Sequence, residues 1–257
     1  MTERVLHLKS PPIVEAVLDI QCDLPPGFDL AALEQSARAA FRDQYPKFAP
    51  QIQQSMRIAV VPARAPAGAP NVTTAQALQA LQFLHEDQKQ LVQIRASGFA
   101  FNRLAPYSSL DAYLPEIART WALFVAVAQP KLIRSIHLRY INRILLPLDS
   151  RGSVDLDDYL SQGPRLPDED RLTFAGFISQ SSAHENATGN RVNITLAAQT
   201  PEHDALPIIF DIETIATGNL EADDWAAIEI KMRSLRTLKN MVFQNSLTDK
   251  CLSLFQH

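Results

Sequence analysis

The sequence predicts an α+β fold in which helices cover one side of a mostly antiparallel sheet. Short segments alternate apolar and polar residues with the period of half-buried strands, and longer segments repeat apolar residues with the period of a helix. The strands follow one another in runs that helices interrupt, which is typical of this fold class. The chain has 257 residues, 46% of them hydrophobic, so it is long enough to bury a sizeable core.

The first half of the chain, residues 1–130, is expected to run strand, helix, three strands, helix. Its first strand alternates clearly, with Leu18 and Ile20 on one face and Glu15 and Asp19 on the other. The predicted elements are a strand at 13–22, a helix at 30–45, a strand at 51–61, a long Pro- and Ala-rich loop at 62–74, strands at 78–86 and 91–104, and a helix from 109 or 111 to 129. Pro115 is expected to lie in the first turn of that last helix or to mark its true start.

The second half, residues 131–257, repeats this order, so we expect two pseudo-repeated β-α-β-β-β-α halves. No flexible linker separates them, so they are expected to pack as one compact unit that shares one sheet or stacks two. The predicted elements are a strand at 131–146, a short helix at 154–160, strands at 171–181, 191–199 and 206–217, a long helix at 221–245 and a helical tail at 249–255.

Composition excludes several classes of protein. The formal net charge of −4 argues against a broadly nucleic-acid-binding surface. The two cysteines, Cys22 and Cys251, lie far apart in the sequence and are interpreted as free thiols in a reducing compartment. No segment has the length and apolarity of a signal peptide or a membrane span, so we expect a soluble cytoplasmic protein without membrane contact.

Charged residues on the predicted strands offer the clearest functional signal. In the first half, acidic residues lie on the first strand and arginines on a later one. In the second half, basic residues lie on the first strand and acidic residues on a later one. The connection between strand and central helix adds an arginine and a tyrosine. The candidate site residues are Glu15, Asp19, Arg95, Arg103, Tyr107, His137, Arg139, Arg143, Asp211 and Glu213.

Two interpretations of these residues remain open. In the first, they form a ladder of ion pairs on a solvated sheet face, each pair contributing about 0.2–1 kcal/mol. In the second, the uncovered face of the sheet is a polar surface that binds a partner, because arginine presents a rigid fork of donors suited to carboxylate or phosphate. If the two first strands pair, Glu15 and Asp19 are expected to meet Arg139 and Arg143 directly.

Other basic residues have simpler explanations. Arg103 and Tyr107 are expected to anchor the junction between the halves, through backbone carbonyls or Glu116, with ligand binding as the alternative. The long C-terminal helix carries a basic stripe behind an acidic first turn, an order that the helix dipole favours by itself. The residues of the stripe are Lys231, Arg233, Arg236 and Lys239.

Four segments of the chain resemble a family of uncharacterised bacterial proteins with a sporadic distribution. The segments are SPPIVEAVLDI, FAFNRLAPYSSLDAY, LRYINRILLP and TDKCLSLF, and the family pattern is similar in its PPI-EA, F-F-RL-PY and RYINRI motifs. The resemblance covers essentially the full length. It implies no reaction, cofactor or catalytic residue, and the patchy distribution suggests mobile defence or toxin–antitoxin modules.

The usual catalytic signatures are absent from the sequence. It contains no phosphate-binding loop, no G-x-G-x-x-G, no nucleophile elbow and no His/Cys cluster, so neither a cofactor nor a metal is expected. The leading hypothesis is a non-enzymatic module that binds a protein partner, a second copy or an anionic small ligand on the charged sheet face. The alternatives are a nucleic-acid-associated protein, or a hydrolase or nuclease that uses carboxylates among Glu15, Asp19, Asp211 and Glu213.

Overall fold

A single antiparallel sheet forms the centre of the molecule. The computed structural model describes residues 8–59, 71–168, 171–172 and 174–256, with backbone only for 54–59 and 71–76. Across these residues nine strands form one sheet, accompanied by four α-helices and one turn of 3₁₀ helix. The predicted α+β class with an antiparallel sheet is therefore confirmed.

The elements follow one another in this order: β1 (Ile13–Asp23), α1 (Leu30–Phe41), β2 (Lys47–Ala59), β3 (Asn71–Leu84), β4 (Gln90–Arg95), β5 (Gly98–Leu104), α2 (Leu110–Ala128), β6 (Leu132–Pro147), η1 (Leu156–Asp158), β7 (Ile178–His184), β8 (Arg191–Ala198), β9 (Ala205–Glu221), α3 (Trp225–Ser246) and α4 (Asp249–Ser253). The order across the sheet is β2-β3-β4-β5-β1-β6-β9-β8-β7. The first strand of each half, β1 and β6, thus pair near the centre.

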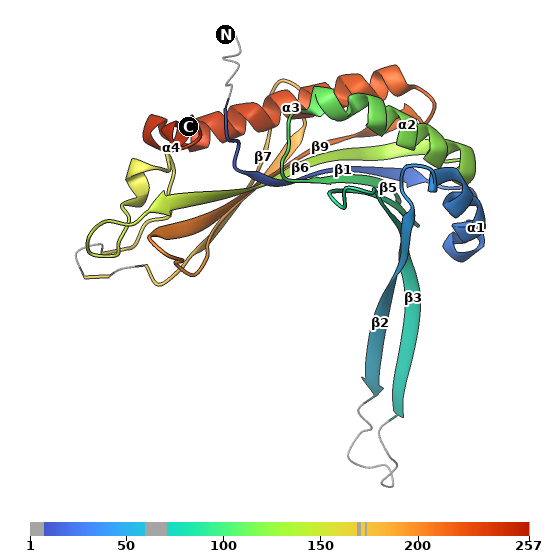
Figure 1. Ribbon diagram of the computed structural model, residues 1–257, viewed down its shortest axis with the longest axis horizontal. Coiled ribbons are helices and arrows are strands. Elements are labelled where there is room, and N and C mark those ends of the chain that lie inside the picture. Colours follow the sequence, from blue (N-terminus) through green and yellow to red (C-terminus); the bar gives the residue numbers. More distant parts are fainter. Residues whose placement is uncertain (1–7, 60–70, 169–170, 173, 257) are drawn as a thin grey trace.

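The two long helices, α2 and α3, lie on the same face of an arched sheet and leave the central part of the other face open (Figure 1). Alternation along β1 explains this arrangement, because Leu18 and Ile20 are buried beneath the helices while Glu15 and Asp19 point to the open side. The covering helices bury an apolar stripe at helical spacing, and Trp121 of α2 donates its indole N–H to the carbonyl of Ala222 at 2.9 Å.

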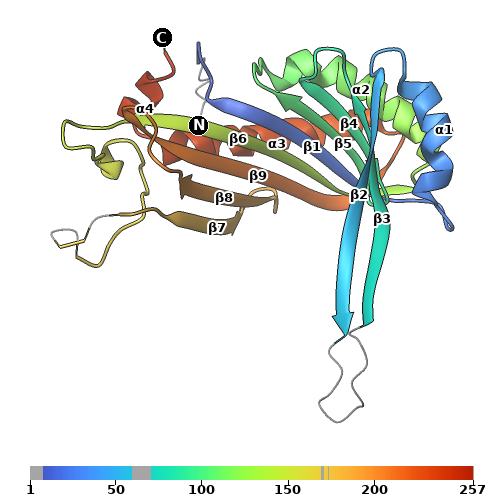
Figure 2. The same cartoon turned by 60° about the horizontal axis from the view of Figure 1, so that its bottom comes forward.

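The β2–β3 hairpin projects from one end of the sheet, away from the helices (Figure 1). It joins the rest of the sheet only where residues 80–84 of β3 pair with β4. Beyond that point each strand pairs only with the other. The opposite end of the sheet is the edge strand β7 (Figure 2).

Side-chain caps fix where the helices begin. Asp29 accepts from the N–H of Ala31 at 2.9 Å, Ser109 caps α2, and Asp224 caps α3. The predicted start of the last helix at residue 221 is wrong, because β9 continues through Glu221. Pro115 lies in the second turn of α2 and not in the first, because the helix already begins at residue 110.

Four other predicted segments differ from the structure. Residues 91–104 form two strands, β4 and β5, so four strands and not three follow the first helix. The helix predicted at 154–160 is only the single turn η1, and the strand predicted at 171–181 begins at 178 and continues to His184. Part of the predicted loop at 62–74 belongs to β3, and the remainder lies outside the described residues.

Candidate functional site

The open face of the sheet brings most of the predicted site residues together. Because β1 and β6 are antiparallel neighbours, Val17 lies opposite Arg139 and Asp19 lies opposite His137. On the other side of β6, Arg139 lies opposite Glu213 of β9. Directly paired residues share a face, so the polar side chains of these three strands form one surface. We call this surface, made by β1, β6, β9 and their neighbours β4, β5, β8 and β7, the polar face.

Arg139 is held by a carboxylate, and Arg143 is held by an amide oxygen and a carboxylate. The Nε atom of Arg139 donates to both carboxylate oxygens of Asp211, at 2.9 and 3.0 Å. Arg143 donates through Nε to Gln199 at 3.2 Å and through Nη2 to Glu202. Asp211 raises the already high pKa of Arg139 mainly by accepting these hydrogen bonds. Both guanidinium groups are therefore fixed in position on the polar face.

A chain of hydrogen bonds runs across the polar face from β6 to β7. His137 Nδ1 and Glu213 Oε1 lie 3.0 Å apart, Asn193 donates to the second oxygen of Glu213 at 2.8 Å, and Ser182 donates to Asn193 at 2.8 Å. The hydrogen bond from His137 is the largest influence on Glu213 and holds the pKa of its carboxyl at about 2. Glu213 is thus ionised and positioned by neighbours on both sides.

The acidic residues of β1 have partners within the first half. Asn102 of β5 donates to Glu15 at 2.8 Å. Asp19 Oδ1 and Arg95 Nη2 lie 2.6 Å apart, although neither atom makes a hydrogen bond of normal geometry, so charge alone holds this pair. Both carboxylates therefore lie on the polar face with a polar neighbour.

The expected direct meeting of Glu15 and Asp19 with Arg139 and Arg143 is wrong. The two first strands do pair, but the register places Ile141 opposite Glu15 and His137 opposite Asp19. The carboxylates of β1 and the guanidinium groups of β6 are therefore offset along the strands. Arg139 binds Asp211 of β9 instead, and Arg143 binds Gln199 and Glu202 in the connection between β8 and β9. A register offset of two residues separates the predicted partners.

Arg103 and Tyr107 lie on the helix side and not on the polar face. Arg103 forms an ion pair with Asp87 and lies 5.3 Å from the ring of Tyr113. The hydroxyl groups of Tyr107 and Tyr140 are 3.0 Å apart, which joins the two halves through a tyrosine pair and not through Glu116 or a carbonyl. Tyr107 thus anchors the junction as expected, whereas Arg103 makes its ion pair within the first half.

The basic stripe of α3 packs against its neighbours. Arg233 and Arg236 both donate to Asp111 at the start of α2, each at 2.5 Å. Lys239 Nζ lies 4.2 Å from the centre of the Tyr140 ring, and burial lowers the pKa of this lysine to about 8. These residues connect α3 with α2 and the sheet.

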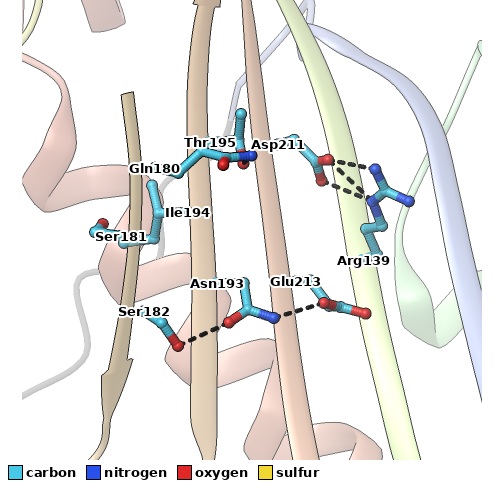
Figure 3. A pocket seen from close by; sticks show the side chains of 9 residues that line it. All are labelled: Arg139, Gln180, Ser181, Ser182, Asn193, Ile194, Thr195, Asp211 and Glu213. Carbon is cyan, nitrogen blue, oxygen red and sulfur yellow. Dashed lines mark hydrogen bonds and ion pairs between the residues drawn. The ribbon is translucent and has the colours of Figure 1, made fainter. Parts of the chain in front are cut away.

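The polar face contains a shallow depression of about 500 Å³ at its β6–β7 end (Figure 3). Its rim includes the Arg139–Asp211 pair, in which the arginine side chain is 47% exposed and the aspartate only 15%. The residues that line it are Arg139, Gln180, Ser181, Ser182, Asn193, Ile194, Thr195, Asp211 and Glu213. Sequence reasoning missed the contributions of β7 and β8, although Asn193 and Thr195 alternate with apolar residues and carried the signal.

One part of the network has the order of a catalytic triad. Ser135 Oγ lies 3.0 Å from His137 Nε2, and His137 Nδ1 is the atom that faces Glu213. Ser135, however, lies within a strand and is only 6% exposed, so its hydroxyl is closed to a substrate carbonyl. We therefore interpret these three residues as a structural network.

Three further observations concern metal ligands, thiols and long apolar helices in the described part of the chain. No group of three or more His, Cys, Asp or Glu side chains there could hold a metal ion. Cys22 and Cys251 are both free and buried, and burial raises the pKa of each thiol to about 12. None of the described helices is both long and apolar enough to span a bilayer.

Three of the segments that carry the family resemblance form adjacent strands. They supply β1, β5 and β6, which lie side by side in the order β5-β1-β6. Backbone hydrogen bonds join these segments at their ends. Ala105 donates its N–H to the carbonyl of Val14, and Arg143 donates its N–H to the carbonyl of Pro12. No family model matches the chain, and no curated protein matches it.

Proposed function

We propose that this chain is a non-enzymatic binding protein that engages a protein partner across the polar face. The observation that carries the proposal is the one-sided covering of the sheet, which leaves the central part of its other face open (Figures 1 and 2). That open face carries the paired polar groups described above. The depression adds a concave area lined by hydrogen-bonding side chains, and protein–protein interfaces typically contain several direct hydrogen bonds.

The pairing of charges favours a protein over a nucleic acid. Three arginines of the polar face, Arg95, Arg139 and Arg143, already neighbour a carboxylate, and Glu15 and Glu213 add further negative charge. Phosphate groups would have to displace those carboxylates, and nucleic-acid affinity depends on unpaired cations that release counterions. A surface with both signs interspersed suits the mixed charges of a protein.

Internal ion pairs prepare Arg139 for binding. Asp211 receives hydrogen bonds from Nε and Nη2 of Arg139, which fixes the plane of the guanidinium group. About half of the side chain remains exposed. A partner carboxylate or carbonyl can then bind the same group without a new loss of side-chain entropy, which is the advantage of a preorganised site.

We further infer that the two halves, residues 1–130 and 131–257, arose as copies of one β-α-β-β-β-α unit, from which the first half differs by an additional strand and the second by a single 3₁₀ turn in place of its first helix. The strand order supports this. In each half the first strand, β1 or β6, lies at the centre of the sheet, and the last strand of the same half, β5 or β9, lies directly beside it. If the halves are related, the part of the polar face formed by residues 1–130 should resemble the part formed by residues 131–257. A role in a defence or toxin–antitoxin module rests on the family resemblance alone.

The test asks which face of the molecule meets other proteins in the cell. A photo-crosslinking amino acid is placed at Thr195 on the polar face, or at the exposed Thr237 on α3 as the matched control. We expect one dominant crosslinked protein from position 195 and none from position 237. The adduct should disappear in the paired variant Arg139→Gln with Asp211→Asn, which removes both charges without leaving either group unpaired.

Two results would contradict the proposal. The first is equal crosslinking from both positions, which would mean that the polar face is no special surface. The second is an adduct at position 195 that persists unchanged in the paired variant. A further control variant, Glu34→Gln with Arg38→Gln, removes an exposed ion pair of α1 and should leave the adduct intact.

A further inference from the structure

The edge strand β7 is open along its outer side. It is the last strand of the sheet and pairs only with β8, and Figure 2 shows no described element beside its free edge. All seven of its residues are exposed, on both faces of the sheet. Such an edge presents a row of backbone N–H and C=O groups without strand partners, which is a template for another strand.

Proteins normally protect such edges, and this protein does so at the other end of its sheet. The outer strand there, β2, carries Lys47 and Pro50, and its pairing with β3 has an irregularity between Gln51 and Ile52. β7 has none of these features. Its sequence, ISQSSAH, contains no lysine, no acidic residue and no proline, and its pairing with β8 is regular throughout.

We propose that β7 is a docking edge that receives an extended segment of a partner protein as a tenth strand. In this mode main-chain hydrogen bonds provide the affinity, and the alternating side chains provide the selectivity. Every strand pair of the sheet is antiparallel, and antiparallel pairing is slightly more stable per residue. The added segment therefore runs antiparallel to β7.

The size of the edge favours a peptide segment over a second copy of the chain. Seven residues span roughly 24 Å, and a sheet layer is about 10 Å thick, so the contact covers about 240 Å² per partner. The total, about 480 Å², is far below the roughly 1,200 Å² of a stable dimer interface. It is enough for a short segment whose backbone is fully paired.

The side chains of β7 indicate the chemistry of that segment. Ser179, Ser181 and Ala183 on one face are small, which leaves room for bulky β-branched or aromatic neighbours. Ile178 at one end is 75% exposed and offers an apolar contact. The strand contains no lysine, arginine, aspartate or glutamate. We therefore expect an uncharged segment, rich in β-branched residues, with an apolar residue opposite Ile178.

This inference is independent of the charges of the polar face. The edge and the depression adjoin, because Gln180 and Ser182 belong to both, but main-chain pairing needs neither Arg139 nor Asp211. The variant Arg139→Gln with Asp211→Asn should therefore still bind peptides at β7, even if it no longer binds the protein partner of the polar face. Failure of the proposed function and failure of this inference are distinguished in this way.

The experiment selects the segment from a displayed library of random heptapeptides. The full-length chain is the bait, and the variant Ser179→Lys with Ser181→Lys, which adds charge to the free edge, is the counter-selection. Selected peptides are then titrated by fluorescence anisotropy, alongside versions with N-methyl groups on alternate amides. A control variant, Ser36→Lys with Thr237→Lys, adds the same charge at exposed helical positions.

We expect selected peptides to bind the unaltered and control chains equally and the edge-lysine variant at least tenfold more weakly. Peptides with one of the two N-methyl patterns should also bind at least tenfold more weakly, because their methyl groups block the amides that face β7. The inference is overturned if no peptides are enriched, if both N-methyl patterns bind like the parent, or if loss of Arg139 and Asp211 removes the affinity. The inference is also overturned if the unaltered chain sediments as a dimer and the variant Ser179→Lys with Ser181→Lys sediments as a monomer.

Discussion

Glu213 shows how a single residue connects the sheet with the polar face. Its carboxylate accepts from Asn193 on one side and faces His137 Nδ1 on the other. Because the pKa of Glu213 is about 2, the carboxylate stays ionised in neutral solution and can only accept. His137 Nδ1 therefore carries the proton, and when the imidazole is neutral, Nε2 accepts from Ser135.

The lowered pKa of Glu213 predicts a stability difference that depends on pH. A carboxyl whose pKa is lower in the folded state stabilises the fold above its unfolded pKa of about 4.5, and this contribution is lost as the pH falls towards about 2. The variant Glu213→Gln should lower the free energy of unfolding by about 1–2 kcal/mol at neutral pH, after allowance for partial exposure. The deficit should shrink between pH about 4.5 and 2.

Urea denaturation at neutral and acidic pH measures this difference. Glu34→Gln is the control, because Glu34 makes only an exposed ion pair with Arg38, and it should cost little at any pH. A deficit for Glu213→Gln that stays constant across the pH range would show that the charge of Glu213 contributes nothing to stability.

At this scale the sequence predicted the residue types well and their partners poorly. Alternation along β1 and β6 placed Glu15, Asp19, His137, Arg139 and Arg143 on one face. The partners depend on strand register, which is set by turns and by core packing that no single strand encodes. The direct pairing predicted across β1 and β6 failed for that reason.

Among the elements, the β4–β5 hairpin is the one that sequence reasoning missed and that most affects the site. Within residues 91–104 the buried positions change from even numbers, Val92 and Ile94, to odd numbers, Phe99 and Phe101. That change of parity marks the turn, and it also places Arg103 on the helix side. By residue type, the dipeptide Ser97-Gly98 signals the turn.

Gly98 provides a direct test of how the hairpin packs against β1. Its φ is +137°, and an added Cβ would lie 2.1 Å from the carbonyl oxygen of Ile20. Gly98→Ala should therefore lower the free energy of unfolding by about 3 kcal/mol or more, from backbone strain and steric overlap together. Chemical denaturation measures the loss.

Gly152 is the matched control for this substitution. Its φ is +74°, but no atom lies within 4 Å of the position of an added Cβ. Gly152→Ala should cost only about 1 kcal/mol, the strain of the left-handed conformation. Equal losses at the two positions would show that the close approach of β5 to β1 is not what Gly98 provides.

At the scale of the whole molecule, one-sided covering of the sheet was predicted from the order of helices and strands along the chain. The long projection of the β2–β3 hairpin and the open edge at β7 were not. Both features depend on where strands stop pairing, because β3 pairs with β4 only from residue 80 to residue 84 and β7 has only β8 as a neighbour. Local sequence patterns indicate that a segment is a strand, but not how many neighbours it has.

The most direct test of the account is the affinity of the crosslinked partner for variants of the polar face. Purified partner is titrated by calorimetry against the unaltered chain, the variant Arg139→Gln with Asp211→Asn, and the control Glu34→Gln with Arg38→Gln. We predict at least tenfold weaker binding for the polar-face variant alone, with its melting temperature within a few degrees of the parent. Unchanged affinity in that variant would contradict the proposal that the polar face binds the partner.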